Sequence, residues 1–444
     1  MADPLRIAGG QGFYGDATGP LADVLDEQPD VVVLEALAEL TLAILTKDRQ
    51  RNETLGWTRD LPLYLMTLLP AVLDRGLKVI TNAGGINPVA AATMVGEAAR
   101  RMGLGGLTLG TVVGDDVRAR PELLPEGFPD PEELLFANAY LGARPVVEAL
   151  ERGADVVITG RVADAALFLA PQVHHHGWAW DDWDRLAAGT VVGHLLECSG
   201  QMTGGNHAGR WWEVPDPWRF GFPIADVAED GSAVVTKPRG AGGRVDFDTV
   251  RQQLLYEVHD PSSYLTPDVV LDMTTVQLAD LGDDRVEVTG ATGRPATGRY
   301  KVVAAIGGGY AADMSIALGW PDAPAKGRAL ADLARKRVAE AGVAVEDWHI
   351  ELFGVNALHG PAVPPAPADQ PAEVVLRLAW RCADSDTCAA VARHIVPLGL
   401  SGPPPAFTGA SRARPRPSQL LGLHSGTVDR APIDAAVRVN VESL

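Results

Sequence analysis

One unit repeats between residues 5 and 171 and constrains the fold most strongly: a short apolar run, a glycine-rich or polar turn, then a helical stretch. Short runs rich in β-branched residues are typical of strands buried on both faces of a parallel sheet. Strands that alternate with helices predict an α/β fold, here a doubly wound, mostly parallel sheet in the N-terminal half. The expected strands are residues 5–8, 31–34, 78–81, 107–113 and 155–159.

The segments between these runs have the composition and the end signals of helices. Pro62 and Pro88 stand near two expected starts, where a proline costs no hydrogen bond, and Gly76 and Gly103 follow two expected ends. The expected helices are residues 36–49, 61–74, 88–101 and 131–152.

Polar or glycine-rich turns follow every expected strand. In doubly wound folds the carboxyl ends of the strands meet at one edge of the sheet, where ligands bind. One such turn could need these residues for its geometry alone, but five together favour a ligand site. They are residues 9–16, residue 35, residues 82–87, residues 114–116 and residues 159–164.

The first turn, GQGFYGD at residues 10–16, has the spacing of a dinucleotide-binding loop, and Glu35 follows where a ribose-binding acid is expected. However, Asp16 places negative charge where a pyrophosphate would lie, and Gly19-Pro20 interrupts the start of the next helix. We therefore interpret the turn as one wall of a small-molecule pocket, with Asp16 as a polar contact or a local cap. Binding of NAD(P) is the alternative.

Two further turns carry candidate ligand-binding groups. In NAGGINP at residues 82–88 the glycines allow close backbone approach, and the helix start offers N–H groups to an anion; N-capping by Asn87 is the alternative. In TGRVAD at residues 159–164, Arg161 could clamp a carboxylate or phosphate and Asp164 could act as a general base. The alternative is an ion pair that caps the helix.

An apolar face at helical spacing predicts a helix over residues 184–201, which ends in ECSGQMTGGN at residues 197–206. Glu197 is a candidate acid or base. Cys198 is a candidate nucleophile, but a helix C-terminus disfavours a thiolate, so a structural role is favoured. The adjacent histidines at residues 174–176 point in different directions, and we expect no metal site.

These motifs define two sets of candidate residues. The candidate catalytic residues are Arg161, Asp164, Glu197 and Cys198. The candidate substrate-binding residues are Gly10, Gly12, Asp16, Glu35, Asn82, Gly84, Gly85, Asn87, Thr203, Gly204, Gly205 and Asn206.

The second half of the sequence predicts α+β structure. Helices are expected at residues 248–259, 325–341 and 387–396, and strands at residues 269–278, 285–289, 300–306 and 372–383. Gly307-Gly-Gly-Tyr310 is expected to end a strand; the backbone there could approach a ligand or an oxyanion, although a flexible turn is favoured. The expected domains are an α/β ligand-binding domain at 1–205, an α+β domain at 206–360, a proline-rich linker at 361–371 and a small α+β segment at 372–444.

Two clusters in this half could contact other molecules. The aromatic residues Trp211, Trp212, Trp218, Phe220 and Phe222 could cover a ligand, although a subunit or domain contact is favoured, and we expect a homo-oligomer. The basic cluster could meet an anionic substrate or stay solvated; it consists of Arg412, Arg414 and Arg416.

The overall composition limits the possible partners. The chain has 38 basic and 57 acidic residues, a net charge of −19, which argues against nucleic acid and anionic membranes as partners. Three cysteines without a C-x-x-C pair argue for a reducing compartment. No signal peptide and no apolar run of about 20 residues are visible, so we expect a cytoplasmic protein.

Several of these stretches together resemble the acyclic terpene utilisation (AtuA-like) family. They are GQGFYGD, LAE at residues 37–39, NAGGINP, TGRVAD, ECSGQMTGGN and SGPPP at residues 401–405, in order along nearly the whole chain. The last loop departs from the family where Pro405 replaces an expected glycine. The resemblance implies an enzyme of small-molecule metabolism, in a pathway for branched terpenoids that runs through coenzyme A thioesters.

The sequence is compatible with three functions. The first is a cofactor-independent enzyme with lyase- or hydratase-like acid–base chemistry on a branched acyl or terpenoid substrate, which could be an acyl-CoA. The second is an NAD(P)-dependent oxidoreductase. The third is a non-catalytic accessory or binding subunit.

Overall fold

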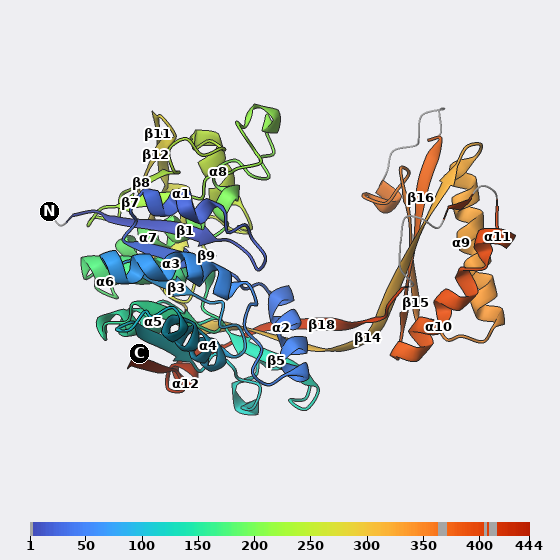
Figure 1. Cartoon of the computed structure of the whole chain (residues 1–444), viewed down its shortest axis with the longest axis horizontal. Helices are drawn as coiled ribbons and strands as arrows, with labels where there is room; N and C mark the ends of the chain where they lie inside the picture. Colours follow the sequence, from blue (N-terminus) through green and yellow to red (C-terminus); the bar gives the residue numbers. More distant parts are fainter. Residues whose placement is uncertain (1–2, 363–370, 404–405, 408–414) are drawn as a thin grey trace. The chain divides into compact units, whose positions relative to one another are not determined.

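The computed structural model describes residues 3–362, 371–403, 406–407 and 415–444. The chain forms two compact units, Met1–Ala305 with Leu423–Leu444 and Ile306–Gly422. It enters the smaller unit within strand β14 (Arg299–Gly319) and returns within β18 (Ser418–Asp429), which pairs with β14 (Figure 1). The domain boundaries that we expected at residues 205/206 and 360/361 fall inside these two units, and most of the expected linker lies outside the described residues.

The larger unit is built on a ten-stranded mixed sheet in the order β11-β12-β8-β7-β1-β2-β3-β6-β4-β19. Its five central strands, β1-β2-β3-β6-β4, are all parallel, and the outer strands pair antiparallel. The central strands are β1 (Leu5–Gln11), β2 (Val31–Leu34), β3 (Lys78–Thr81), β6 (Val156–Thr159) and β4 (Thr108–Val113). The outer strands are β7 (Ile224–Val227), β8 (Ala233–Thr236), β11 (Gln277–Gly282), β12 (Arg285–Thr289) and β19 (Arg438–Ser443).

Helices pack on both faces of the parallel strands, which confirms the doubly wound fold. One face carries α1, α3 and α4, which share a core with the strands; the other carries α5, α6 and α7. The first three helices are α1 (Pro20–Asp26), α3 (Leu61–Arg75) and α4 (Pro88–Arg101). The others are α5 (Arg144–Glu151), α6 (Asp164–His176) and α7 (Trp183–Leu196).

The helix ends follow the local sequence. Proline stands in the first turn of α1, α3 and α4, where its missing N–H leaves no hydrogen bond unmade. Gly76 and Gly177 end α3 and α6 in the left-handed conformation, which glycine adopts without steric cost. Each buried Leu or Val of the core contributes about 1.5–3 kcal/mol through removal of its side chain from water.

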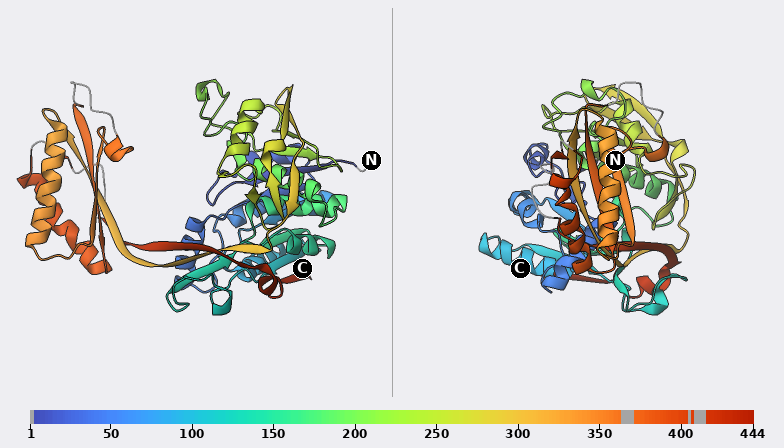
Figure 2. Two further views of the ribbon diagram at one scale, coloured as in Figure 1. Left: turned by 180° about the vertical axis from the view of Figure 1, so that it is seen from behind. Right: turned by 90° about the vertical axis from the view of Figure 1, so that its right-hand side faces the viewer.

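The remaining elements of the larger unit surround this sheet (Figure 2). Helix α8 packs against α7, and α2 packs against β5. Strands β13, β10 and β9 form a separate antiparallel sheet. The bounds are α2 (Glu39–Arg51), α8 (Phe247–Leu255), α12 (Arg430–Asp434), β5 (Leu134–Ala139), β9 (Tyr264–Leu265), β10 (Val269–Asp272) and β13 (Thr292–Pro295).

The expectation of one helical stretch over residues 131–152 is wrong. Its first part forms β5, which pairs with β14, and only its last part forms α5. Phe136, Ala137 and Asn138 of β5 are buried. Pairing with a distant strand overrides the local helical pattern here.

The smaller unit contains an antiparallel sheet in the order β15-β16-β14-β17, with α9 and α10 packed on β16. The order and directions are those of a split β-α-β arrangement. The glycine run predicted that a strand ends at residues 307–310. This prediction is wrong, because β14 continues through these residues as far as Gly319. The bounds are α9 (Ala323–Glu340), β15 (Asp347–Phe353), β16 (Glu373–Cys382), α10 (Ser385–Ile395), α11 (Leu398–Ser401) and β17 (Ala406–Phe407).

Candidate functional site

The sheet topology singles out the gap between β3 and β6. The chain leaves β3 towards α4 on one face of the sheet and leaves β6 towards α6 on the opposite face. A crevice opens at such a switch point, beyond the carboxyl ends of the strands. The two turns approach closely here, since a Cβ on Gly84 would lie 2.5 Å from the carbonyl oxygen of Thr159. Asn82, Arg161 and Asp164 follow these two strands.

Arg161 is the centre of a buried ionic cluster at the carboxyl ends of β3 and β6. Its Nη1 donates to the Leu37 carbonyl and to Asp164 Oδ1, both at 2.7 Å, and lies 3.7 Å from Glu35 Oε1. The guanidinium carbon is 4.0 Å from the centre of the Tyr140 ring. Although burial opposes its charge, Asp164, Tyr140 and Glu35 raise the pKa of Arg161 above its ordinary value. Arg161 is therefore a fixed positive charge at the switch point.

Glu35 shares this cluster and is held by two donors. Its Oε1 accepts from Asn82 Nδ2 at 2.9 Å and from the Leu37 N–H at 2.8 Å, and Asn82 Oδ1 accepts from the Ala36 N–H at 2.8 Å. Burial raises the pKa of Glu35 well above its ordinary value, and the charge of Asp164 raises it further. Glu35 is thus a carboxyl group that retains its proton more strongly than an exposed glutamate.

Glu197, at the end of α7, adds a second carboxyl group with a shifted pKa. A Cβ on Gly193 would lie 2.5 Å from the Ala165 carbonyl oxygen, so the end of α7 packs tightly on the start of α6. Glu197 Oε1 is 3.0 Å from His194 Nδ1. Burial raises the pKa of Glu197 to about 6, and the charge of Asp164 adds to this effect. The carboxyl group can therefore gain or lose a proton near neutral pH.

Cys198 follows Glu197 and lies on the wall of a cavity. Burial raises the pKa of its thiol, and the charge of Glu197 raises it further. A neutral thiol is a poor nucleophile, which favours the structural role of Cys198 over the catalytic one.

The cavity beside Cys198 has a volume of about 810 Å³. It lies between the first glycine turn, the segment that follows α7, and an aromatic segment around residues 217–222. Its size is within the range of pockets that bind small molecules. Its lining includes Gly12, Asp16, Cys198, Trp218, Phe220 and Tyr256.

The first glycine turn holds this wall through its packing. Gly10 lies inside β1, where a Cβ would collide with Val32 and Leu34. A Cβ on Gly12 would collide with the backbone of Cys198 and Ser199. Both glycines therefore allow close packing, and only Gly12 lines the cavity.

Asp16 holds the same turn by hydrogen bonds. Its Oδ2 accepts from the Gly12 N–H at 2.9 Å and from Ser199 Oγ at 2.7 Å, and its Oδ1 accepts from the Ala17 N–H. Asp16 thus ties the turn to the segment after α7 and lines the cavity.

Gly84, Gly85 and Asn87 do not line this cavity. A Cβ on Gly85 would collide with Leu45 and with the Gly56 carbonyl oxygen. Asn87 Oδ1 accepts from the Ala90 N–H and caps α4, while its Nδ2 donates to two backbone carbonyls. The N-cap alternative for this motif therefore describes the geometry.

The loop after α7 divides between the cavity and the interior. Gly205 and Asn206 line the cavity, with Asn206 Nδ2 donating to Gln201 Oε1 at 3.1 Å. Thr203 is buried, and its Oγ1 donates to the Gly221 carbonyl at 2.8 Å. Gly204 has a φ of 107° and packs on Val214.

Three residues of the site were missed in the sequence. His194 stands three residues before Glu197 on a helix, a spacing that places both on one face and was available as a signal. Tyr140 was hidden in the expected helix over residues 131–152; its hydroxyl donates to Glu39 at 2.7 Å. Tyr256, on the cavity wall, has its pKa raised to about 12, mainly by a hydrogen bond with Glu257.

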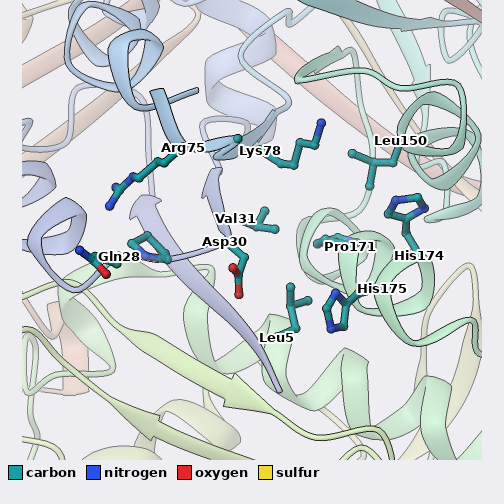
Figure 3. Close-up of a pocket in the computed structure, with 12 residues that line it drawn as sticks. Leu5, Gln28, Asp30, Val31, Arg75, Lys78, Leu150, Pro171, His174 and His175 are labelled. Carbon is teal, nitrogen blue, oxygen red and sulfur yellow. The ribbon is translucent and has the colours of Figure 1, made fainter. Parts of the chain in front are cut away.

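A second cavity, of about 470 Å³, lies at the opposite, amino edge of the parallel strands (Figure 3). Figure 3 shows Arg75, Lys78, His174 and His175 around it, together with Asp30 at the start of β2. Lys78 Nζ is paired with Asp155 at 2.9 Å. This edge is not the one at which doubly wound folds bind ligands.

Two further findings concern metal ligands and membrane-spanning helices. Within them, no group of three or more His, Cys, Asp or Glu side chains is arranged to hold a metal ion. No helix in the same ranges is long and apolar enough to cross a bilayer. Arg412 and Arg414 of the basic cluster lie outside the described residues, as does Pro405.

The comparison with family models agrees with the motifs that surround the site. The model of the acyclic terpene utilisation family protein AtuA matches residues 5–439. The chain belongs to this family. The AtuA match spans both units and includes all the candidate residues named above. Neither a search of curated proteins nor a search of solved structures finds a match. Membership in the AtuA family implies a role in acyclic terpene utilisation.

Proposed function

We propose that this protein is an enzyme that moves a proton on an acyclic terpenoid or another branched acyl substrate, in lyase- or hydratase-type chemistry. The observation that carries the proposal is the buried Glu197, with a pKa of about 6; Glu197 does not itself line the 810 Å³ cavity, but the next residue, Cys198, does. A general base is most effective when its pKa is near the working pH.

The two shifted carboxyl groups support different roles. Glu197, with a pKa of about 6, is mostly ionised at neutral pH and accepts the proton from the carbon next to the substrate carbonyl. Glu35, whose pKa is raised well above its ordinary value, retains a proton that it can share with substrate oxygen. Pairs of carboxyl groups with separated pKa values are a general arrangement for acid–base catalysis.

Arg161 supplies the positive charge that this chemistry needs. Removal of a proton next to a carbonyl places negative charge on the carbonyl oxygen. A fixed charge in a buried site stabilises such an oxyanion without reorganisation. Arg161 is 2% exposed and held by Asp164 and Leu37, so it is already oriented. In a lyase step, the C–H electron pair then forms the double bond while the leaving group departs with its own pair.

The cavity suits a branched apolar chain. Trp218, Phe220 and Phe222 provide an apolar wall, and Asp16 and Asp23 are the acidic groups that also line the cavity. A terpenoid acyl group would lie along the aromatic wall with its carbonyl towards Glu197. The substrate in this proposal is the free acid or its coenzyme A thioester, and the proton transfer itself requires no cofactor.

The proposal is tested by solvent exchange. The protein is incubated in D₂O with acyclic terpenoid acids and their coenzyme A thioesters, and deuterium uptake or a mass gain of one water is followed by mass spectrometry. We expect incorporation with the native protein and a loss of about 10²–10⁴-fold with Glu197→Gln. Glu229→Gln, an exposed glutamate outside the cluster, is the control. Equal exchange by Glu197→Gln and the native protein would contradict the proposal.

Binding of NAD(P) is a second candidate only because of the spacing of Gly10, Gly12 and Gly15. Three observations argue against it. The Gly12 N–H is bonded to Asp16, α1 has only seven residues, and Glu35 is buried in the Arg161 cluster. Calorimetry with NAD⁺, NADH, NADP⁺ and NADPH tests this alternative, and micromolar binding would support it.

A further inference from the structure

A third cavity, of about 420 Å³, lies at the carboxyl edge and contains none of the groups used in the proposed reaction. It is lined by residues of α2, of the turn before α4, and of β5 and the segment that precedes it. We name it the Arg49–Arg118 cavity. The lining residues that matter are Arg49, Glu53, Asp116, Arg118 and Asn138.

The two arginines are oriented but lack acidic partners. Arg49 Nη1 donates to the Ile86 carbonyl at 2.8 Å, and Arg118 Nη1 donates to the Leu135 carbonyl at 3.2 Å. In the part of the chain that the structure describes, neither guanidinium forms an ion pair, whereas many other arginines do. Each keeps N–H donors for a ligand, because a guanidinium has five. Two unpaired cations at one cavity favour an anionic group.

Asn138 places an unpaired amide oxygen beside this cavity. It is 1% exposed, and its Nδ2 donates to Asp115 Oδ2 at 2.8 Å, which fixes the orientation of the amide. Its Oδ1 is buried and accepts no hydrogen bond from any described residue. A buried acceptor without a donor destabilises the fold, and a ligand hydroxyl that donates to it would remove this cost.

We propose that the Arg49–Arg118 cavity binds a small hydroxylated anion, with its carboxylate or phosphate on Arg49 and Arg118 and a hydroxyl donating to Asn138 Oδ1. Asp116 and Glu53 also line the cavity and disfavour an anion that lacks hydrogen-bond donors. The volume of about 420 Å³ suits a small metabolite.

The cavity is linked to the candidate active site through one residue. Asp115 Oδ2 accepts from Asn138 Nδ2 and from the Arg161 N–H, both at 2.8 Å. A ligand on Asn138 is therefore two hydrogen bonds from the backbone of Arg161. The binding site itself is independent of the proposed reaction, and its test requires no turnover.

The test is calorimetric titration of the full-length protein with four probes. Glycerol 3-phosphate and lactate carry hydroxyl groups, whereas propyl phosphate and propionate are their analogues without them. We expect at least one hydroxylated probe to bind at least 10-fold more tightly than its analogue, since the analogue leaves Asn138 Oδ1 unpaired. The better of the two probes identifies phosphate or carboxylate as the anionic group.

Variants locate the binding. Arg49→Gln and Arg118→Gln should each weaken binding of the better probe by about 10-fold or more, because a charge-assisted hydrogen bond is lost. The double variant Arg100→Gln/Arg101→Gln, at the far end of α4, removes two exposed charges and should leave binding unchanged. Absence of binding by all four probes, equal affinity with and without the hydroxyl, or retained affinity in both cavity variants would overturn the proposal.

Discussion

The two edges of the parallel sheet carry similar residue types but use them differently. At the amino edge, Asp155 accepts from Lys78 Nζ and from the Thr108 N–H, both at 2.9 Å, and so ties the start of β3 to the start of β4. At the carboxyl edge, Arg161 and Glu35 are buried and shift each other's pKa, and the charge of Asp164 raises the pKa of both Glu35 and the buried Glu197. The difference shows that burial shifts the pKa values of the carboxyl-edge groups, whereas the partly exposed pair of Lys78 and Asp155 joins neighbouring strands.

The largest difference in stability is expected between Arg161→Ala and Lys78→Ala. Arg161→Ala removes a buried guanidinium and leaves Asp164, whose side chain is 36% exposed, and the Leu37 carbonyl without their donor, and we expect a loss of about 3 kcal/mol in the free energy of unfolding. Lys78 is one-third exposed, and Lys78→Ala should cost at most about 1 kcal/mol. Urea denaturation measures both. Similar losses in the two variants would remove the proposed contrast between the edges.

The pH dependence of stability should come from buried carboxyl groups of the carboxyl edge. Burial raises the pKa of Asp115 from 3.8 to about 6. Because the folded state then binds the proton more tightly than the unfolded state, stability is higher below about pH 4 and falls as the pH rises to about 6. A rise of about two in the pKa of Asp115 corresponds to a change of about 3 kcal/mol in the free energy of unfolding.

Asp115→Asn should remove this part of the slope between pH 4 and pH 7. The matched control is Lys78→Gln at the amino edge, which alters a partly exposed ion pair and removes no buried carboxyl group. An unchanged slope in Asp115→Asn would show that Asp115 titrates normally.

The rate profile provides the next contrast. With Glu197 as the base, kcat should rise through a pKa of about 6. The hydrogen bond from His194 lowers the pKa of Glu197. In His194→Gln the rise of kcat with pH should therefore occur about one pH unit higher, while catalysis persists. His175→Gln at the amino edge should not move it. If kcat of His194→Gln rises at the same pH as kcat of the native protein, His194 does not control the pKa of Glu197.

The smallest effect is expected from the histidines of the amino edge. His174 is largely exposed; its partial burial lowers its pKa, although the charge of Glu151 opposes this shift. We expect His174→Gln to change the free energy of unfolding by less than about 0.5 kcal/mol, with turnover unchanged. A large loss of turnover in this variant would indicate that the active site lies at the amino edge, which contradicts the proposal.

Much of the fold could be predicted from the sequence because its signals are local. The runs at 31–34 and 78–81 match β2 and β3, and the proline and arginine that bound α4 match its ends. The failures come from long-range pairing. Residues 134–139 form β5 because β14 pairs with them, and residues 307–310 stay extended within the same long strand.

The site shows the same division between local and distant information. Carboxyl-edge turns at Glu35, Asn82 and Arg161 could be placed together from the α/β pattern alone. The contact of Tyr140 with Arg161 could not, since it depends on β5. The spacing of Gly10, Gly12 and Gly15 suggested a phosphate loop, yet Gly10 is needed for packing against Val32 and Leu34.

The central claim is that substrate binds at the carboxyl edge, beside Glu197. The most direct measurement is a crystal structure of Glu197→Gln soaked with an acyclic terpenoid acid or its coenzyme A thioester. We predict density for the acyl chain along Trp218 and Phe220, with its carbonyl towards residue 197. Density for the acyl chain in the amino-edge cavity, next to Lys78 and His174, would contradict the account.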